Sequence, residues 1–234
     1  FQIPYKTIAL KDDLRIDCTK FYGLKESIVL ANPNAQTGLY LPPEEIKALL
    51  AHSNAPVILD EAYIDFGGES AVPLTARFPN LLITGTFSKS RNLAGARIGF
   101  AIGDAALIAD LNTLKFSFNP YNLNRLSILA GREAIKDETY FKKCTAQIMQ
   151  AREFTKQGLQ KLSFTCTDSL ANFVLAASPR ISGKQLYQSL KERGILVRYL
   201  GDACIQNYVR ITIGTMEQMQ ILLNTIEQIL QEET

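Results

Sequence analysis

The stretch TGTFSKSRNLAGARIGF, residues 84–100, places hydroxyl, amine and guanidinium groups close together in the chain. Thr86 and Ser88 lie just before Lys89, and Arg97 follows the lysine by eight residues. Hydroxyl donors with an arginine can bind a phosphate group, because the planar guanidinium matches phosphate oxygens. A lysine in the same turn can bind an aldehyde. The stretch therefore indicates a ligand that carries both groups.

Further polar residues follow other apolar runs of the sequence. Asp60 ends the run PVILD and Tyr63 comes three residues later, whereas Asn34 and Thr37 follow the run SIVLA. In open α/β sheets, ligands bind at the carboxyl ends of the strands. We therefore expect these side chains to meet Lys89 at one edge of a sheet.

Pyridoxal 5′-phosphate needs this combination of groups. Its aldehyde condenses with a lysine, and its ring nitrogen needs a carboxylate partner to remain protonated. Its phenolic oxygen needs hydrogen-bond donors, and its phosphate needs hydroxyls and an arginine.

The segments NPNAQTG, VILDEAY, TFSKSRNLAGARIGF and YVRITIG follow one another in this order. Together they resemble the fold-type I, class II-like aminotransferases that use pyridoxal phosphate, and within these the histidinol-phosphate aminotransferases. The resemblance extends from about residue 5 to the C-terminus. The ordered set is far more specific than any one segment.

The resemblance implies a role for each matching residue. Lys89 resembles the lysine that holds the cofactor and then acts as general base. Asp60 resembles the partner of the pyridine nitrogen, and Tyr63 the phenol bonded to the cofactor's O3′ oxygen. The phosphate ligands would be Thr86, Ser88 and Arg97.

Two arginines near the C-terminus resemble substrate ligands of that family. Arg210, in YVRITIG, resembles the clamp for the substrate α-carboxylate, and Arg198, in GILVRYL, matches a position that helps to hold the substrate phosphate. The resemblance thus implies transamination of histidinol phosphate with 2-oxoglutarate in histidine biosynthesis. It also implies a cytoplasmic homodimer with small-molecule partners.

The chain departs from the family pattern in three places. Ala35 stands where the family has the asparagine that meets O3′, and Asn34 is the neighbouring residue that would replace it. Ser-Lys is followed by Ser-Arg-Asn rather than Ala-Phe-Gly, so Arg91 and Asn92 lie beside the lysine. About a third of a typical member is absent on the N-terminal side, which indicates a fragment or an incomplete enzyme.

Two alternatives remain open at this point. A threonine-phosphate decarboxylase would carry the same motifs, because only the orientation of the substrate on the cofactor distinguishes the two reactions. A non-catalytic remnant of the aminotransferase fold would explain Ala35 and the missing segment, but it has no reason to keep the lysine, the aspartate and the arginines.

Alternating short strands and helical patterns must position these residues. Apolar runs predict buried strands at 27–32, 56–62, 80–86 and 97–103, and the Pro-Pro-Glu-Glu start predicts a helix between the first two. This alternation predicts an α/β fold with a mostly parallel sheet and helices on both faces, incomplete at its N-terminus. We assign it to residues 1–150.

Residues 151–234 are expected to form a small α+β domain. A helix over about 139–162 would connect the two domains, followed by strands at 172–177, 195–200 and 207–214. Helices are predicted over 182–194 and at the C-terminus, where Thr215 and Gln218 can form a capping box.

Composition argues against several classes of function. The net charge is only +2, with no basic run, which disfavours nucleic acid as a partner. No apolar run approaches the roughly 18 residues of a membrane span. The four cysteines are scattered and form no CxxC pair, so reduced thiols are expected. The single histidine, His52, disfavours a metal site or a Ser-His-Asp triad and is expected on the surface near a helix end.

Overall fold

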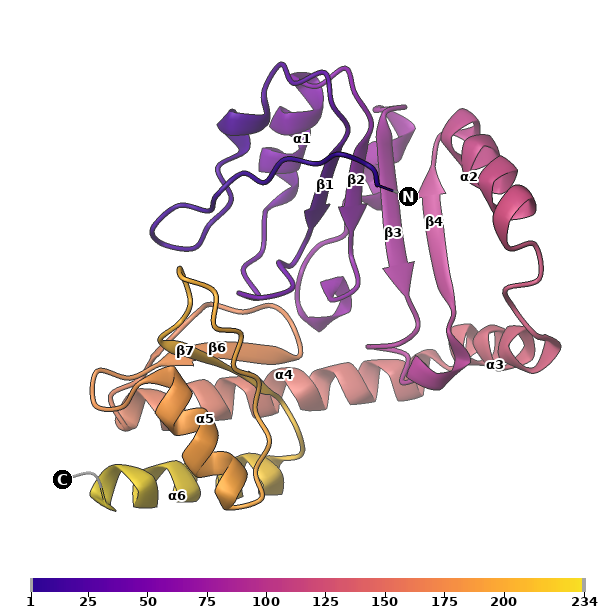
Figure 1. The fold of residues 1–234 in the computed structure, drawn as a ribbon. Helices are drawn as coiled ribbons and strands as arrows, with labels where there is room; N and C mark the ends of the chain where they lie inside the picture. Colours follow the sequence, from indigo (N-terminus) through magenta and orange to yellow (C-terminus); the bar gives the residue numbers. More distant parts are fainter. Residues whose placement is uncertain (1, 233–234) are drawn as a thin grey trace.

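The computed structural model describes residues 2–232, which form two sheets joined by one long helix, α4 (Figure 1). The larger sheet has the order β1-β2-β3-β4. β1, β2 and β3 are parallel, and β4 pairs with β3 in the antiparallel direction, so the expected mostly parallel sheet is confirmed. Its strands are β1 (Ile28–Ala31), β2 (Val57–Asp60), β3 (Leu81–Thr86) and β4 (Gly99–Gly103).

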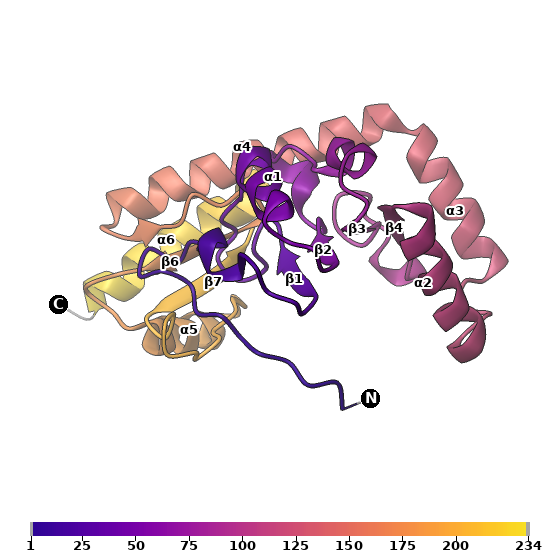
Figure 2. The same cartoon turned by 90° about the horizontal axis from the view of Figure 1, so that it is seen from above.

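Helix α1 (Pro43–Ala51) makes the connection between β1 and β2. Pro43 opens the helix, where a missing N–H has no cost, and acidic residues occupy the first turn beside the positive end of the helix dipole. Ile46, Leu49 and Leu50 are buried in one core cluster, which also includes residues of β1, β2 and β3 such as Leu59. Helix α2 (Ala105–Phe118) lies on the other side of the sheet, next to β4 (Figure 2).

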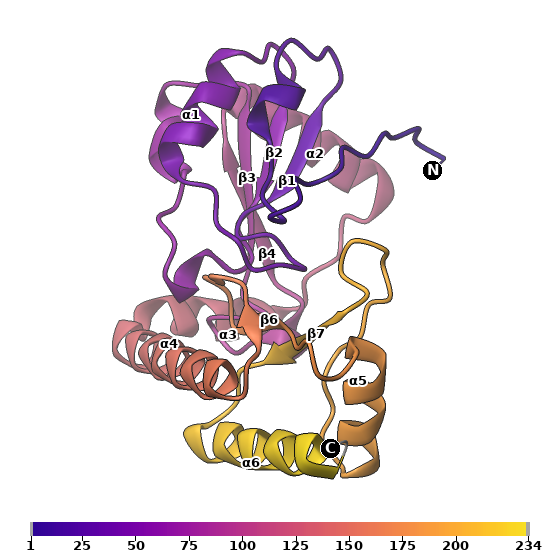
Figure 3. The same cartoon turned by 90° about the vertical axis from the view of Figure 1, so that its left-hand side faces the viewer.

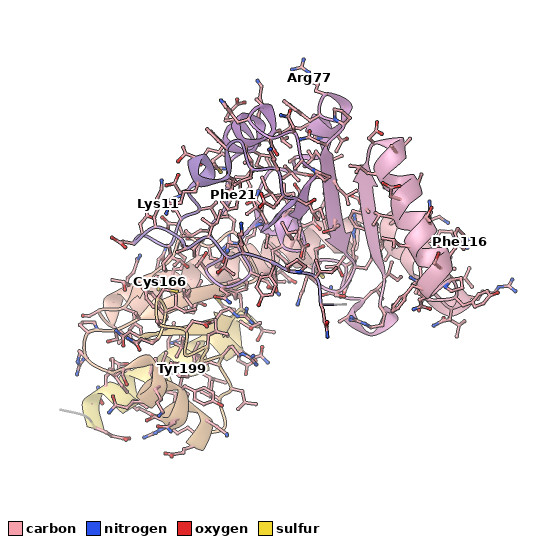
Figure 4. All side chains as sticks on the ribbon, turned by 45° about the horizontal axis from the view of Figure 1, so that its top comes forward. Lys11, Phe21, Arg77, Phe116, Cys166 and Tyr199 are labelled. Carbon is pink, nitrogen blue, oxygen red and sulfur yellow. The ribbon has the colours of Figure 1, made fainter. Side chains whose placement is uncertain are left out.

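Strand β4 was expected to be buried, and this prediction is wrong. Phe100 and Ile102 are 46% and 38% exposed, and no residue of α2 is buried within the part of the chain that the structure describes. Phe116 projects outward from α2 (Figure 4). β4 is the antiparallel edge strand of the sheet, so among residues 2–232 no strand pairs with its outer side.

The second sheet is antiparallel and lies below the carboxyl ends of β1–β3 in Figure 1. Its strands are β5 (Thr165–Cys166), β6 (Phe173–Ala177) and β7 (Tyr208–Thr212). The helices that follow α2 in the chain are α3 (Arg125–Lys136), α4 (Glu138–Lys161), α5 (Gly183–Glu192) and α6 (Met216–Glu232) (Figure 3). Short 3-10 helices complete the fold: η1 (Cys18–Phe21), η2 (Ile64–Phe66), η3 (Val72–Ala76) and η4 (Ala94–Ala96).

The capping box at the start of α6 is confirmed. The Gln218 N–H donates to Thr215 Oγ1 at 3.2 Å, and the Thr215 N–H donates to Gln218 Oε1 at 2.9 Å. The expected strand at 195–200 is wrong, because only Arg198 pairs there, as an isolated bridge to Arg210. The residues on either side of Arg198 pair with no strand among residues 2–232.

Alternation along β6 and β7 gives the small sheet two different faces. Val174, Val209 and Ile211 pack in one core with residues of α4, α5 and α6. Successive residues of a strand point to opposite faces of the sheet. Phe173 is next to Val174 in β6, and Arg210 lies between Val209 and Ile211 in β7, so both point to the other face. They therefore face away from those helices, toward the larger sheet.

The part of the molecule around the larger sheet and the part around the small sheet are called its two halves below, and they meet at Gly38. This contact predicts a large effect of a small substitution. Gly38 has φ +72°, and a Cβ there would lie 2.1 Å from Ser169 Oγ. Gly38→Ala should lower the unfolding free energy by about 1–3 kcal/mol, from backbone strain and overlap. Gly95→Ala, where a Cβ would meet no atom within 4 Å, is the control. Urea unfolding measures both, and equal stability of the two variants would contradict the prediction.

The remaining expectations concern single residues. His52 caps the end of α1 and stacks on Tyr22 with ring centroids 4.2 Å apart, as a surface position near a helix end predicts. All four cysteines are free thiols. Over residues 2–232, no helix has the length and apolar character needed to cross a membrane. The division near residue 150 stays a prediction.

Candidate active site

The carboxyl ends of the three parallel strands lie at one edge of the larger sheet. Register pairs Ala31 with Asp60 and Asp60 with Thr84, so the chain leaves β1, β2 and β3 at nearly the same level. In Figure 1 these three arrowheads point toward the small sheet. The loops that follow them carry Asn34, Tyr63 and Lys89. The predicted convergence on one edge is thus what parallel pairing produces.

Asp60 and Tyr63 are positioned by the turn that follows β2. Asp60 is half-buried, and its Oδ1 accepts a hydrogen bond from the Ala62 N–H at 3.1 Å. No hydrogen bond within the described chain uses Asp60 Oδ2. Tyr63 is the residue that precedes η2, and its ring lies beneath Lys89, whose Nζ is 5.3 Å from the ring centroid. The structure therefore places the amine next to the phenol ring.

Lys89 lies in a closed turn between β3 and β4. The Asn92 N–H donates to the Lys89 carbonyl at 3.2 Å, and the Leu93 N–H donates to the Phe87 carbonyl at 2.9 Å. Asn92 has φ +57°, a conformation that asparagine tolerates better than most residues. Asn92 can therefore occupy a position where the resembled family has glycine.

Two residues close to Lys89 attach this turn to other elements, and no sequence pattern predicted either contact. Ser90 is buried and its hydroxyl donates to Asp65 of η2. Arg91 donates to the Ala134 carbonyl at 2.9 Å and to Glu138 Oε1 at 3.0 Å, and its guanidinium covers the Phe141 ring. The departure from Ala-Phe-Gly thus supplies polar anchors for the lysine turn.

The predicted phosphate ligands flank the same turn. Thr86 Oγ1 and Ser88 Oγ lie 2.9 Å apart, and the Ser88 N–H donates to Thr86 Oγ1 at 3.1 Å. Arg97 is exposed, has φ +56°, and donates to the Ala94 carbonyl at 3.1 Å. The structure brings the two hydroxyls together and leaves the guanidinium of Arg97 on the surface at the start of β4.

The side-chain oxygen of Asn34 forms hydrogen bonds within its own loop. Oδ1 accepts hydrogen bonds from the Gln36 and Thr37 N–H groups at 3.0 Å each. The described contacts of this side chain do not involve Nδ2, which is the atom that could donate to O3′. Its role as a cofactor ligand stays a prediction.

Arg210 reaches from the small sheet to the loop after β1. Its Nη1 donates to the Ala35 carbonyl at 2.8 Å, and its Nε is buried without a hydrogen-bond partner among residues 2–232. A buried, unpaired donor of a charged group is costly, so the site suits an anion that accepts from it. Because the carbonyl makes this contact, the Ala35 departure leaves it intact.

Arg198 lies directly opposite Arg210. Each backbone N–H donates to the other's carbonyl, at 2.9 Å and 2.8 Å. Directly opposed residues of an antiparallel pair project from the same face, and two like charges there repel each other. Arg198 is exposed. An anion held between the two guanidinium groups would relieve this repulsion.

Phe173 connects the two parts of the site, and sequence reasoning missed it. Its ring meets the Tyr63 ring edge-on at 5.3 Å, and Arg210 Cζ lies 4.9 Å from its centroid. An unbroken series of contacts therefore runs from Lys89 through Tyr63 and Phe173 to Arg210. A phenylalanine in an apolar strand has the pattern of a core residue, so nothing in the sequence marks Phe173 for this role.

Glu61 follows Asp60 but does not belong to the site. It is buried, and its carboxylate accepts from the Ser70 hydroxyl at 2.5 Å and from the Ala71 N–H at 2.7 Å. Burial raises the pKa of Glu61, while these hydrogen bonds oppose the shift. Glu61 holds the segment around Ser70 in place.

The donor set fits pyridoxal 5′-phosphate. The amine of Lys89, in the turn after β3, lies beside the phenol of Tyr63, in the loop after β2, and paired hydroxyls flank the lysine. The carboxylate of Asp60 ends β2, and its Oδ2 takes part in no hydrogen bond among residues 2–232. Lys89 would hold the aldehyde carbon, Asp60 the ring nitrogen and Tyr63 the phenolic oxygen. Thr86 and Ser88 would hold the phosphate, with Arg97 after its side chain turns from Ala94.

Comparison with known proteins agrees with this chemistry. Residues 4–226 match the family model described as "Aminotransferase class I and II". The chain is 44% identical over 231 residues to a "Histidinol-phosphate aminotransferase" of Clostridium botulinum (strain Okra / Type B1), which covers 98% of this chain and 65% of that protein. The chain thus spans about two thirds of the length of this relative.

Two solved structures share the fold. The histidinol-phosphate aminotransferase of Clostridium acetobutylicum is 26% identical, with a TM-score of 0.82 over 88% of this chain and 64% of that one. The L-threonine-O-3-phosphate decarboxylase of Porphyromonas gingivalis is 23% identical, with a TM-score of 0.75 over 87% and 60%, a likeness that shows the fold alone. The chain therefore belongs to the class I and II aminotransferases, a family of enzymes that use pyridoxal 5′-phosphate.

Proposed function

We propose that this chain carries out transamination between histidinol phosphate and 2-oxoglutarate, a step of histidine biosynthesis. The observation that carries the proposal is the contact series from Lys89 through Tyr63 and Phe173 to Arg210. It joins a site for an amine to a site for an anion. The name of the 44% identical relative supports the choice of substrate.

The chemistry of the substrates fits the two arginines. Histidinol phosphate carries a phosphate ester where an amino acid carries its α-carboxylate, so Arg210 would hold this phosphate in one half-reaction. In the other half-reaction Arg210 would hold the α-carboxylate of glutamate or 2-oxoglutarate. Arg198, directly opposite, adds a second positive charge for a dianionic phosphate.

The residues of this chain have separate tasks around the reacting carbon. Bound pyridoxal phosphate supplies an aldehyde for the amine and a ring that withdraws electrons. Lys89 Nζ would take a proton from the substrate Cα in one half-reaction and would deliver a proton to the Cα of the second substrate in the other. Asp60 would keep a proton on the ring nitrogen, and Tyr63 would donate to the phenolic oxygen. Arg210 would hold the distant anion and so orient the Cα–H bond.

Substrate assays test this proposal against the decarboxylase alternative. The full-length protein is incubated with pyridoxal phosphate and either histidinol phosphate with 2-oxoglutarate or threonine phosphate alone. Glutamate formation in the first mixture supports the proposal. Carbon dioxide release from the second, without glutamate in the first, would replace it with decarboxylation. No turnover in either mixture would favour the non-catalytic alternative.

Arg198→Ala should distinguish phosphorylated from unphosphorylated substrates. A charged hydrogen bond contributes about 1.5–3 kcal/mol, so kcat/KM for histidinol phosphate should fall roughly 10- to 150-fold. Activity with an unphosphorylated amino donor should fall much less. Arg193→Ala is the control, because Arg193 lies nearby on the surface and pairs with Glu232. Equal losses with both donors would remove the reason to prefer a phosphate-bearing substrate.

We further propose that the active protein is a cytoplasmic homodimer. Leu114, Phe116 and Phe118 of α2 and Leu126 of α3 are each more than 60% exposed. Several large exposed apolar side chains on neighbouring segments of the chain are typical of an interface. Light scattering of the full-length protein tests this assembly.

A further inference from the structure

Arg152 is a buried charged residue that contacts both the segment after β2 and the segment before β6. It lies on α4 and is only 4% exposed. Its Nη1 donates to two backbone carbonyls, those of Phe66 at 2.8 Å and Ala171 at 2.9 Å. One nitrogen therefore joins the larger half of the molecule to the smaller one.

The rest of the guanidinium has little compensation for its burial. Nε has no hydrogen-bond partner among residues 2–232, although Glu153 Oε1 lies 3.5 Å away, within ion-pair distance. Burial lowers the pKa of Arg152, yet arginine keeps its charge in proteins. A buried charge is costly unless it is paired, so a position that needed only packing would be better served by an apolar side chain.

The two carbonyls flank the two aromatic rings of the site. Phe66 ends η2, three residues after Tyr63, and Ala171 lies two residues before Phe173. The Tyr63 and Phe173 rings meet at 5.3 Å. Arg152 thus fixes the backbone on both sides of this ring contact. The backbone also closes over the guanidinium, since a Cβ on Gly67 would lie 3.6 Å from Arg152 Nη2.

We propose that Arg152 is a positioning residue that sets the separation between Lys89 and Arg210 by holding the Tyr63–Phe173 contact. Lys89 lies over Tyr63 and Arg210 lies over Phe173, so a shift of either ring moves the amine and anion sites relative to each other. Misplacement by about 1 Å can lower the rate of a reaction by roughly 100-fold. Arg152 contacts neither reacting group and acts through the two backbone segments.

Arg152→Met tests this role, because methionine fills much of the volume and offers no donor. Hydrogen exchange of the cofactor-free protein is measured over residues 64–68 and 171–175, and we expect exchange there to be at least tenfold faster. Peptides of β1 and β2 should be unchanged. Arg180→Met is the control for the loss of an arginine that donates to a carbonyl, since the exposed Arg180 donates to that of Leu230 at 2.7 Å, within the small half of the molecule.

Kinetics separate positioning from general stability. Arg152→Met should lower kcat/KM by roughly 10- to 100-fold. Its affinity for pyridoxal phosphate should fall less than kcat/KM, because of the proposed cofactor ligands only Tyr63 adjoins a segment that Arg152 holds. Arg152→Lys keeps the charge and can reach one carbonyl, so it should fold and recover part of the loss. It also serves as the test variant if Arg152→Met does not fold.

Two outcomes would overturn the proposal. One is a lower melting temperature with unchanged kcat/KM at a temperature where the variant is folded. The other is exchange at 64–68 and 171–175 no faster than in Arg180→Met. The kinetic part rests on the proposed function, whereas the exchange measurement needs no substrate. Faster exchange in an enzyme inactive on histidinol phosphate would therefore refute the proposed function alone.

Discussion

Lys89→Ala is expected to lower kcat with histidinol phosphate and 2-oxoglutarate by about 10⁴-fold, the upper range for loss of a general acid–base group. Lys89 is the amine at the edge where the parallel strands end, beside Tyr63. The variant loses both the covalent attachment of the cofactor and the base that moves the Cα proton. Fixed-time assays of glutamate formation measure the rate.

Absorbance gives a second measurement of the same change. Wild-type protein with pyridoxal phosphate should be yellow, and the visible band of the lysine-bound cofactor should be absent in Lys89→Ala. Lys184→Ala, on α5 and away from the turn, is the control and should keep both band and rate. A variant at Lys89 that kept the band, or more than about a tenth of the rate, would contradict the role given to this residue.

Arg210→Ala should damage both half-reactions, in contrast to Arg198→Ala. Removing one partner of a buried charge pair costs about 2–5 kcal/mol, which corresponds to roughly 30- to 5,000-fold in kcat/KM. The phosphate of histidinol phosphate and the α-carboxylate of glutamate would both lose the Arg210 guanidinium, whose Nε has no hydrogen-bond partner among residues 2–232. Arg210→Lys should recover little, because an ammonium lacks the planar fork of a guanidinium.

The measurement is kcat/KM for each substrate at saturating cosubstrate, with Arg180→Ala as the control. Loss with only one of the two substrates would show that the anions occupy different sites. Retained activity with both would move the anion site away from the small sheet.

The sequence predicted the main elements of the fold because their signals are local. The start of α1 combines proline, glutamates and an apolar stripe within nine residues, and the capping box of α6 needs only Thr215 and Gln218. The burial of β4 was wrongly predicted for the opposite reason. Its residues Gly99–Gly103 are apolar, but burial depends on neighbours that other segments supply. The predicted strand at 195–200 likewise lacked a partner except at Arg198.

The sequence by itself determined which groups could do chemistry. Lys89, Asp60 and Tyr63 follow apolar strands, and parallel pairing brings the ends of such strands to one edge whatever the details of packing. The cofactor and the family could therefore be inferred before any geometry was known.

Only the tertiary structure decided how the two halves of the site are joined. The hydrogen-bond acceptors of Arg210 and Arg152 are backbone carbonyls of Ala35, Phe66 and Ala171, and every residue has a carbonyl, so no residue type marks them. The Tyr63–Phe173 contact joins residues 110 positions apart in the chain. Such contacts arise from the packing of one sheet against the other, which a local pattern cannot encode.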